Sequence, residues 1–372
     1  MKKGIFRLDW YIVGALLPIL GAGLVTMKSF TGNGTHFGRQ LIWICVGFII
    51  FYICSFIDFR FLRRTRVIIT LFALSILSLL TIFIFGNVAK GAKSWLDLGF
   101  FSIQPADPVK LVLIMLLAKY FSRRHVEIAD IRHIIVSGLY AFVLFFLVLL
   151  QPDFGSAIVL FLIWFGMVLV SGISKKHLAI VFLIGTVAFA GLWNFGFKEY
   201  QKARIKNFIH PLADVRGTGY NAYQAMITVG SGEILGKGIG YGTQSRLKFL
   251  PEYETDFIFA AFAEEWGFIG VLILFILYGI IIYRIFWYAL RGETNFEILY
   301  ATGLAIYFMI HLIINFGMNI GVMPVTGIPV PFMSYGGSHV LAEFLGLGML
   351  MGMKNYARVM HREVIKNEFH GA

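Results

Sequence analysis

Asp256 has clear potential for chemistry, because it directly precedes the apolar stretch Phe257-Ile258-Phe259-Ala260. An ionisable residue at the edge of a membrane segment is a candidate functional residue by default, and its carboxylate can serve as a general base. The structural alternative is that Asp256 caps the following helix. Glu264 and Glu265 lie roughly 12–13 Å further along a straight helix, which is too far for a carboxylate pair with Asp256. We therefore interpret both glutamates as structural.

Further polar motifs lie at the ends of other apolar stretches. Asp107 and Lys110 are three residues apart, so they share one face of a helix. Trp95 precedes them, Asp153 lies within Gln-Pro-Asp-Phe-Gly, and Ser334 begins Ser-Tyr-Gly-Gly-Ser. Each also has a structural interpretation, since Asp and Ser cap helices and Trp is frequent at membrane interfaces. Their convergence at one end of the helices favours a shared site.

The residues around these acids include cations but no recognisable cofactor motif. Arginine can bind phosphate through two hydrogen bonds and lysine as a point charge. The candidates are Lys110, Arg204, Lys206, Arg246 and Lys248. Most of the loop lysines are also explained as solvated charges. The glycine-rich segment 236–242 lacks the strand and the Ser or Thr of a nucleotide-binding loop, and the nine His show no metal-ligand spacing.

The elements that must position these residues are membrane-spanning helices. The chain of 372 residues is 58% hydrophobic and 14% charged, whereas soluble domains are about 25% charged. A span needs about 20 mostly apolar residues. We predict an all-α polytopic membrane protein with about ten spans, at 10–27, 40–57, 66–86, 108–122, 133–150, 154–172, 177–197, 262–283, 297–319 and 333–353.

The distribution of basic residues predicts the orientation of these spans. Segments on the same side as the N-terminus hold 19 of the 32 Lys and Arg residues, and cytoplasmic loops are enriched in such residues. Both termini are therefore predicted to be cytoplasmic. The net charge of +12 is explained by this pattern, and nucleic-acid binding is not expected. We treat residues 1–372 as one domain, with a large extracytoplasmic loop at 198–261 that contains short helices.

An ordered series of motifs resembles the SEDS family, which includes RodA, FtsW and SpoVE. The similarity extends over nearly the whole chain, and its C-terminal part is more similar to the RodA branch, which acts in elongation, than to the FtsW branch, which acts in division. The motifs are Tyr200-Gln201 to Arg204, Gly219-Tyr220, Gln224, Gly230-Ser231-Gly232, Gly236-Lys237-Gly238, Gly242-Thr243-Gln244, Phe249 to Glu252, Thr255 to Phe259, Gln151 to Gly155, Pro324 to Gly327 and Ser334 to Ser338.

The resemblance implies a SEDS fold and a peptidoglycan glycosyltransferase of the bacterial cytoplasmic membrane. Such an enzyme polymerises lipid II at the outer face during cell elongation and shape maintenance, with undecaprenyl diphosphate as the leaving group. A class B penicillin-binding protein is the implied partner. The resemblance makes Asp256 the catalytic acid, and a divalent cation, Mg²⁺ or Mn²⁺, is an open expectation. The residues expected to bind substrate are Lys110, Asp107, Trp95, Arg204, Gln244 and Ser334.

Several positions depart from the family pattern. The usual Gln-Pro-Ser-Glu reads Gln-Pro-Ala-Asp and ends at Asp107, and His339 replaces the usual second Ser after Gly-Gly. Ser94 replaces the usual Arg, and Glu254 the usual His before Thr-Asp. These departures affect the geometry expected for the Asp107–Lys110 pair.

Two other functions remain open from the sequence. A lipid flippase would use polar groups and broken helices at the membrane midplane, for which the candidates are His311, Asn315 and Asn319. Because these three share one helix face, we expect them to form hydrogen bonds between helices instead. A non-catalytic scaffold for a partner enzyme, or an FtsW-like division polymerase, would fit the same composition.

Overall fold

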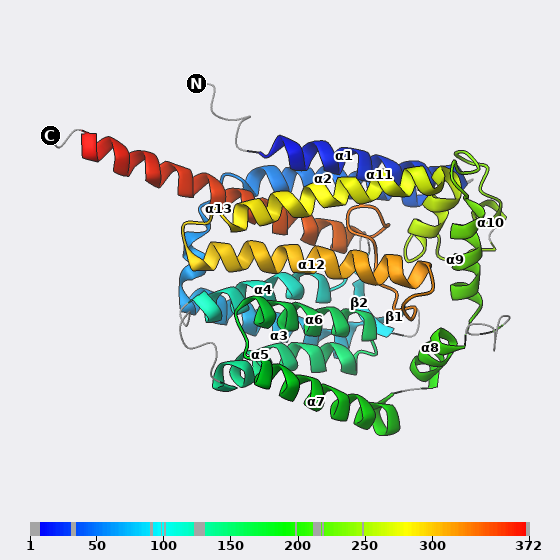
Figure 1. Ribbon diagram of the computed structural model, residues 1–372, viewed down its shortest axis with the longest axis horizontal. Coiled ribbons are helices and arrows are strands. Elements are labelled where there is room, and N and C mark those ends of the chain that lie inside the picture. Colours follow the sequence, from blue (N-terminus) through cyan, green and yellow to red (C-terminus); the bar gives the residue numbers. More distant parts are fainter. Residues whose placement is uncertain are drawn as a thin grey trace.

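Ten long helices dominate the computed structural model (Figure 1). The structure describes residues 8–30, 35–89, 92–97, 99, 102–122, 131–197, 199–210, 217, 219–247 and 249–369. The basic residues Lys2, Lys3, Arg7, Arg123, Arg124 and Lys248 lie outside the described residues. The long helices are α1 (Trp10–Phe30), α2 (Thr35–Cys54), α3 (Thr65–Phe85), α4 (Ala106–Ser122), α5 (Ile131–Leu150), α6 (Phe154–Val170), α7 (Lys175–Gly191), α11 (Ile258–Ala289), α12 (Asn295–Asn319) and α13 (Gly337–Phe369).

These helices correspond one to one to the ten predicted spans. Within the described residues, α1, α2, α3, α5, α7 with its continuation to Gly196, α11 and α12 are long and apolar enough to cross a membrane. Helix α6 is equally apolar but has only 17 residues. The boundaries differ most at the C-terminal ends of α13, which runs on to Phe369 instead of residue 353, and of α11, which runs on to Ala289 instead of residue 283. A turn (η2, Phe59–Arg63) connects α2 to α3.

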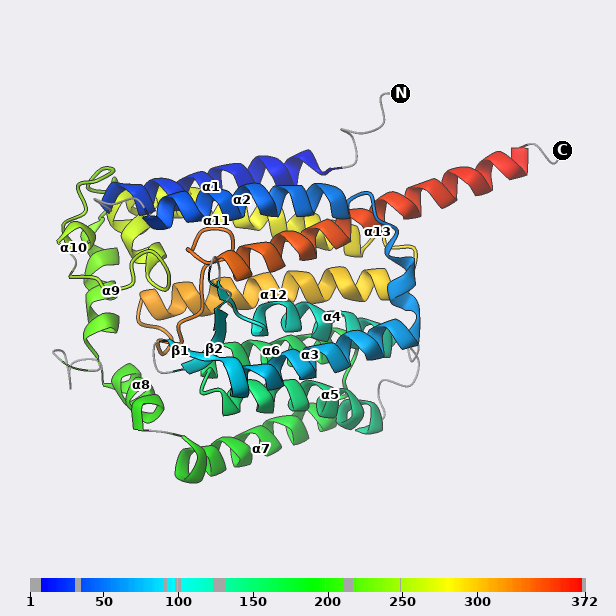
Figure 2. The same cartoon turned by 180° about the vertical axis from the view of Figure 1, so that it is seen from behind.

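The helices run side by side, so that the bundle has two ends. The start of α1 and the end of α13 lie at one end, at the left of Figure 1. The short helices α8 (Glu199–Ile209), α9 (Tyr220–Ser231) and α10 (Thr243–Arg246) lie at the opposite end, as the view from behind in Figure 2 also shows. The prediction of short helices within 198–261 is confirmed.

A small antiparallel sheet, which the sequence reasoning did not predict, lies between α3 and α4. It has the order β1-β2-β3. Trp95 on β2 pairs with Asn87 on β1. The strands are β1 (Asn87–Ala89), β2 (Ala92–Asp97) and β3 (Ser102–Ile103).

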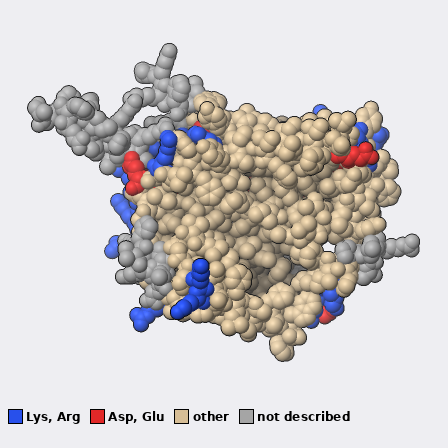
Figure 3. All heavy atoms as spheres, in the orientation of Figure 1, with Lys and Arg blue, Asp and Glu red and all other residues tan. Residues whose placement is uncertain are grey.

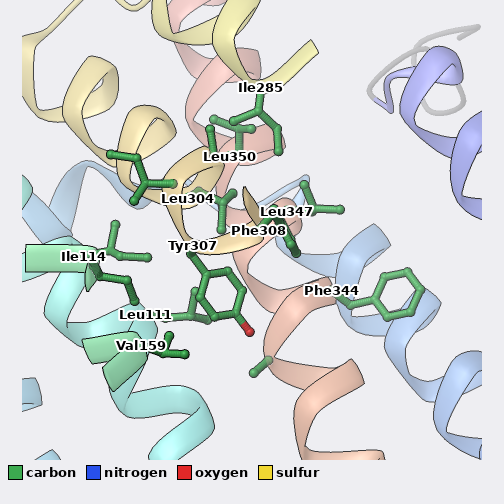
Figure 4. Close-up of a cluster of buried hydrophobic side chains, with 14 of the residues drawn as sticks. Leu111, Ile114, Val159, Ile285, Leu304, Tyr307, Phe308, Phe344, Leu347 and Leu350 are labelled. Carbon is green, nitrogen blue, oxygen red and sulfur yellow. The ribbon is translucent and has the colours of Figure 1, made fainter. Parts of the chain in front are cut away.

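Helices α4 and α12 form the centre of the bundle. Most side chains of α4 are buried, and 72% of the apolar window of α12 is buried. Helix α4 carries Asp107 and Lys110, and charged groups are too costly to expose to lipid, so this helix needs an interior position. Figure 4 shows a cluster of buried apolar side chains from α4, α6, α11, α12 and α13, among them Leu111, Val159, Ile285, Tyr307 and Phe344.

The outer surface of the bundle is suited to hydrocarbon. Helix α7 has no buried residues, and its apolar side chains, such as Phe182 and Leu183, are exposed. The face shown in Figure 3 has Lys, Arg, Asp and Glu side chains toward its two ends and a broad uncharged band between them. This is the distribution expected when a bilayer surrounds the middle of the bundle.

Helix α11 is interrupted near the end that carries Asp256. Gly267 has φ 63° and ψ −168°, which are not helical values. Segment 233–238 lies against this break: Phe268 N donates to Glu233 O over 2.9 Å, and Lys237 N donates to Glu264 O over 2.9 Å. The first part of α11, residues 258–266, is therefore a short half-helix that is held from the side by the loop after α9.

Candidate active site

Asp256 lies at the start of the α11 half-helix and is half-buried. Phe257, not Asp256, occupies the N-cap position of α11. The backbone carbonyl of Asp256 accepts hydrogen bonds from Asn315 Nδ2 over 3.0 Å and from Asn319 Nδ2 over 3.3 Å. We predicted hydrogen bonds between helices, but the acceptor lies in the turn that precedes α11 instead of in a helix. Two side chains of α12 thus fix the backbone that carries the acid.

The segment between α12 and α13 packs against Asp256 from the other side. Ser334 Oγ donates to Thr255 O over 2.7 Å and accepts from Val330 N over 2.8 Å. Gly327 lies so close that a methyl group added to it would be 3.4 Å from Asp256 Oδ2. Ser334 therefore holds the residue next to Asp256, while its own hydroxyl is buried.

A groove that carries Arg204 begins beside this segment. Its wall includes Thr326, which directly precedes the Gly327 that lies against Asp256, while Asp256 itself is not part of the wall. Apolar side chains form most of its wall and Arg204 adds a cation. The lining residues are Phe154, Phe197, Gln201, Arg204, Ile205, Pro324, Val325 and Thr326.

Asp107 and Lys110 form an ion pair inside the bundle. Lys110 Nζ lies 3.1 Å from Asp107 Oδ1, and both side chains are only 3% exposed. The predicted shared helix face is confirmed. The Lys110 ammonium is therefore enclosed within the bundle, whereas the Arg204 side chain lines the groove.

His339 and Glu343 of α13 extend this ion pair, which the sequence reasoning did not find. His339 Nδ1 lies 3.5 Å from Asp107 Oδ1, and its Nε2 lies 2.7 Å from Glu343 Oε1. The ring of His311 stacks on that of His339 with 4.8 Å between centroids. The sequence did contain a signal for this cluster: His339 and Glu343 lie four residues apart inside a predicted span. Ionisable residues within a membrane segment are rare and often functional.

Gln104 links the Gln-Pro-Asp motif to the start of α13. Gln104 Nε2 donates to Asp153 Oδ2 over 2.7 Å, and Gln104 N donates to Ser338 Oγ over 3.2 Å. Asp153 also caps α6, since its Oδ1 accepts from Ser156 N over 3.0 Å. The capping interpretation of Asp153 is confirmed, and the predicted convergence of these motifs at one end of the bundle is confirmed as well.

Two of the predicted site residues lie in other surroundings. Gln244 of α10 accepts a hydrogen bond from Gln224, and its backbone N donates to Glu264 Oε1 over 3.0 Å. Glu264 is fully buried and also pairs with Lys237 at 2.8 Å. Gln244 therefore belongs to the loop that Glu264 holds in place, and Glu264 is structural, as predicted. Trp95 lies on β2 and is half-buried.

The described residues were also tested as ligands for the expected Mg²⁺ or Mn²⁺. In this part of the chain, no three His, Cys, Asp or Glu side chains are arranged to hold a metal ion. Mg²⁺ is often held by one or two carboxylates together with substrate phosphates. The described residues therefore do not form a cation site by themselves.

These observations define a polytopic membrane protein with an acid at the start of a broken helix, beside an apolar groove that contains an arginine. The family model described as "Cell cycle protein", which covers FtsW, RodA and SpoVE, matches residues 5–359. The chain therefore belongs to the SEDS family. The resemblance seen in the motifs is confirmed.

Curated relatives and solved structures agree with this assignment. Peptidoglycan glycosyltransferase MrdB of Escherichia coli K12 is 35% identical over 294 residues, which are 79% of each protein. Stage V sporulation protein E of Bacillus subtilis is 34% identical and covers 94% of this chain and 98% of its own. Probable peptidoglycan glycosyltransferase FtsW of Hydrogenovibrio crunogenus is 34% identical, with 92% of this chain and 90% of its own covered.

Two solved structures share the fold. A chain from a structure titled as a peptidoglycan synthase complex, coordinating polymerization and crosslinking, has a TM-score of 0.80 and 30% identity, and covers 93% of this chain and 98% of its own. The rod shape determining protein RodA of Thermus thermophilus has a TM-score of 0.71 and 28% identity, with 94% and 98% covered. The polytopic SEDS fold predicted from the sequence is confirmed.

Proposed function

We propose that this protein is a peptidoglycan glycosyltransferase that polymerises lipid II into glycan strands. The observation that carries the proposal is the position of Asp256, half-buried at the start of the α11 half-helix, beside a groove that combines apolar walls with Arg204. A lipid-linked sugar diphosphate has both an apolar chain and an anionic group, which matches this groove. The names of the curated relatives support the same reaction.

In this mechanism Asp256 removes the proton from a hydroxyl group of the acceptor sugar. The hydroxyl oxygen attacks the anomeric carbon of the donor, and the bond from that carbon to the diphosphate oxygen breaks. General base catalysis of this kind contributes about 10²–10⁴-fold to the rate. Because attack and departure occur on opposite faces in one step, the anomeric configuration inverts.

Arg204 stabilises the departing undecaprenyl diphosphate. Negative charge develops on the diphosphate as the bond breaks, and a cation already in place stabilises that charge without reorganisation. The groove residues Phe154 and Phe197 supply apolar surface for the polyprenyl chain. We assign Lys110 to the buried ion pair instead, because its ammonium is enclosed together with Asp107.

The proposal is tested with purified protein in detergent and lipid II as the substrate. Wild-type protein should form glycan strands, and Asp256→Asn should not, because the amide keeps the shape but cannot accept the proton. Glu199→Gln is the matched acid-to-amide control, since Glu199 on α8 is 86% exposed. Wild-type polymerisation by Asp256→Asn would show that Asp256 is not the base.

A lipid flippase is the second candidate, favoured by one observation, the break in α11 at Gly267. Broken helices are common at transporter binding sites. In detergent there is no membrane to cross, so polymerisation there is expected only of a polymerase. Transport of lipid II in vesicles together with no polymerisation in detergent would favour the flippase. A scaffold would show wild-type activity of its complex after Asp256→Asn.

We propose that the end of the bundle with α8–α10, and with it segment 198–261, faces the outside of the cytoplasmic membrane and that both termini are cytoplasmic. The test replaces Cys45 and Cys54 by Ala and places a single Cys at Tyr241 or at Leu290, which are 69% and 86% exposed. A membrane-impermeant thiol reagent added to spheroplasts should label position 241 and not position 290. The reverse pattern would contradict the orientation.

We also propose a cross-linking partner, a class B penicillin-binding protein, and a role in elongation. The proposal is supported by the solved structure titled as a synthase complex, to which this chain is similar. Co-expression of the chain with the class B proteins of its own cell should yield one stable complex that polymerises lipid II faster than the chain alone. Recovery of no complex with any of them would contradict the partner.

A further inference from the structure

Two side chains from different helices share one enclosed space beside Lys110. Asp107 has a short acidic side chain, and His339 has a large imidazole ring. They come from α4 and α13, and His339 Nδ1 lies 3.5 Å from Asp107 Oδ1. The shorter acid and the larger ring thus occupy one shared space, in which the side chains are 3% and 5% exposed.

His339 also lies between two carboxylates. Its Nδ1 faces Asp107 and its Nε2 faces Glu343 at 2.7 Å, while Lys110 pairs with Asp107 from the other side at 3.1 Å. Buried charges persist when they are paired, and a doubly protonated imidazole would balance the second acid. His339 is therefore the group that joins the Asp107–Lys110 pair to Glu343.

The joined cluster holds the segment that packs against Asp256. Glu343 Oε2 accepts from Phe332 N over 2.8 Å, and His311, which stacks on His339, lies with its Nδ1 3.3 Å from Pro329 O. In the same segment, two residues after Phe332, the Ser334 hydroxyl donates to Thr255 O. A shift of His339 or Glu343 is thus transmitted to the backbone beside Asp256 through residues 329–334.

We propose that Asp107 and His339 are a matched pair and that, with Glu343, they are positioning residues that set the place of Asp256. The inference rests on the proposed function, since it assigns these residues a role in the same reaction. It names a requirement particular to this chain: the acid at 107 and the residue at 339 must change together.

Positions 107 and 339 must change together because the volume and the charge of the space that they share are fixed. Asp107→Glu adds a methylene to a filled interior, which strains the packing. His339→Ser removes the ring, opens a cavity and leaves two carboxylates facing one Lys110. The two changes made together put the longer acid into the space of the ring, so each relieves part of the damage that the other causes.

The test is a double-mutant cycle with purified wild type, Asp107→Glu, His339→Ser and the double variant. The turnover number and the KM for lipid II are measured well below the melting temperature of every variant. Each single change should lower turnover about tenfold with KM little changed, and the double variant should recover most of that loss, as expected for coupled neighbours. Multiplicative losses in the double variant, or wild-type turnover in both folded single variants, would overturn the proposal.

A second cycle provides the control. His133 on α5 is also buried, but its Nδ1 pairs with Tyr120 at 3.0 Å and not with this cluster. Asp107→Glu combined with His133→Ser should give independent, multiplicative effects, because distant sites do not couple. If His133→Ser restored the turnover of Asp107→Glu as well as His339→Ser does, the rescue would be a general effect. That result would overturn the pairing of Asp107 with His339.

Melting temperatures separate failure of this inference from failure of the proposed function. If wild type and Asp256→Asn both fail to polymerise lipid II, the proposed function fails. The pair is still judged by stability: a double variant that melts above both single variants supports the pairing. The pairing is overturned if the double variant loses as much melting temperature as the two single variants lose together.

Discussion

Asn315 Nδ2 donates to the backbone carbonyl of Asp256 over 3.0 Å and to Ile328 O over 2.7 Å. One fully buried amide of α12 therefore ties together the start of the α11 half-helix and the segment before α13. These are the two stretches of chain that surround the Asp256 carboxylate. The position of Asp256 therefore depends on a neutral side chain of another helix.

Replacing Asn315 with Leu should therefore impair both stability and catalysis. The change keeps a similar volume but leaves two buried carbonyls with fewer donors, at a cost of about 1–3 kcal/mol. Misplacement of Asp256 should lower turnover about tenfold or more. Thermal unfolding and lipid II polymerisation measure the two effects. The control is Asn194→Leu at an exposed site, and equal behaviour of the two variants would contradict the positioning role of Asn315.

The break in α11 should depend on Gly267. Its φ of 63° with ψ of −168° is a conformation that residues with a Cβ avoid, and an added methyl group would lie 2.2 Å from Gly236 N. Gly267→Ala should cost at least about 1–3 kcal/mol. Gly279→Ala, in the same helix with nothing within 4 Å of the added methyl group, should be neutral or slightly stabilising. Equal melting temperatures for the two variants in detergent would contradict the claim that the break in α11 depends on Gly267.

The end of the bundle opposite Asp256 contains the buried acid Asp9. Burial alone would raise the pKa of Asp9, but hydrogen bonds from Tyr288 and Arg284 outweigh burial and hold its pKa below the usual value. Arg284 Nη2 lies 2.6 Å from Asp9 Oδ2. Because the pKa is lowered in the folded state, ionised Asp9 stabilises the fold above its unfolded pKa and less so as the pH falls.

Asp9→Asn should thus lower the melting temperature at neutral pH, and the difference from wild type should shrink on acidification. The difference should be constant from pH 7 down to about pH 5 and then decrease below about pH 4, near the ordinary pKa of an aspartate. Thermal unfolding in detergent over this pH range gives the result. A difference that grows as the pH falls would have the opposite sign and would contradict the ion pair.

Apolar runs made the ten long helices predictable, and the three-residue spacing of Asp107 and Lys110 made their pairing predictable. Both features are local, since they depend on hydrophobic length and on the helical repeat. The convergence of Asp153, Ser334 and Asp256 at one end followed from counting spans. Short helices within 198–261 could be expected because a structureless loop of that length is unusual, but their directions could not.

The contacts that complete the site could not be predicted, because they join segments far apart in the sequence. A helical pattern shows which face His339 occupies but not that Asp107 of another helix meets it. Likewise, the break at Gly267 depends on Glu233 and Gly236, which arrive from the loop after α9. The enclosure of Lys110 in its ion pair with Asp107 is also a result of packing that spacing does not reveal.

The kinetics of Asp256→Asn test the central claim most directly. The variant and wild type are compared at saturating and limiting lipid II, with Glu199→Gln as the control. We predict that turnover falls at least about 10²-fold while KM stays within about threefold, because the base acts in the transition state and not in substrate binding. Wild-type turnover with a raised KM would instead make Asp256 a substrate-binding residue and would contradict its role as the base.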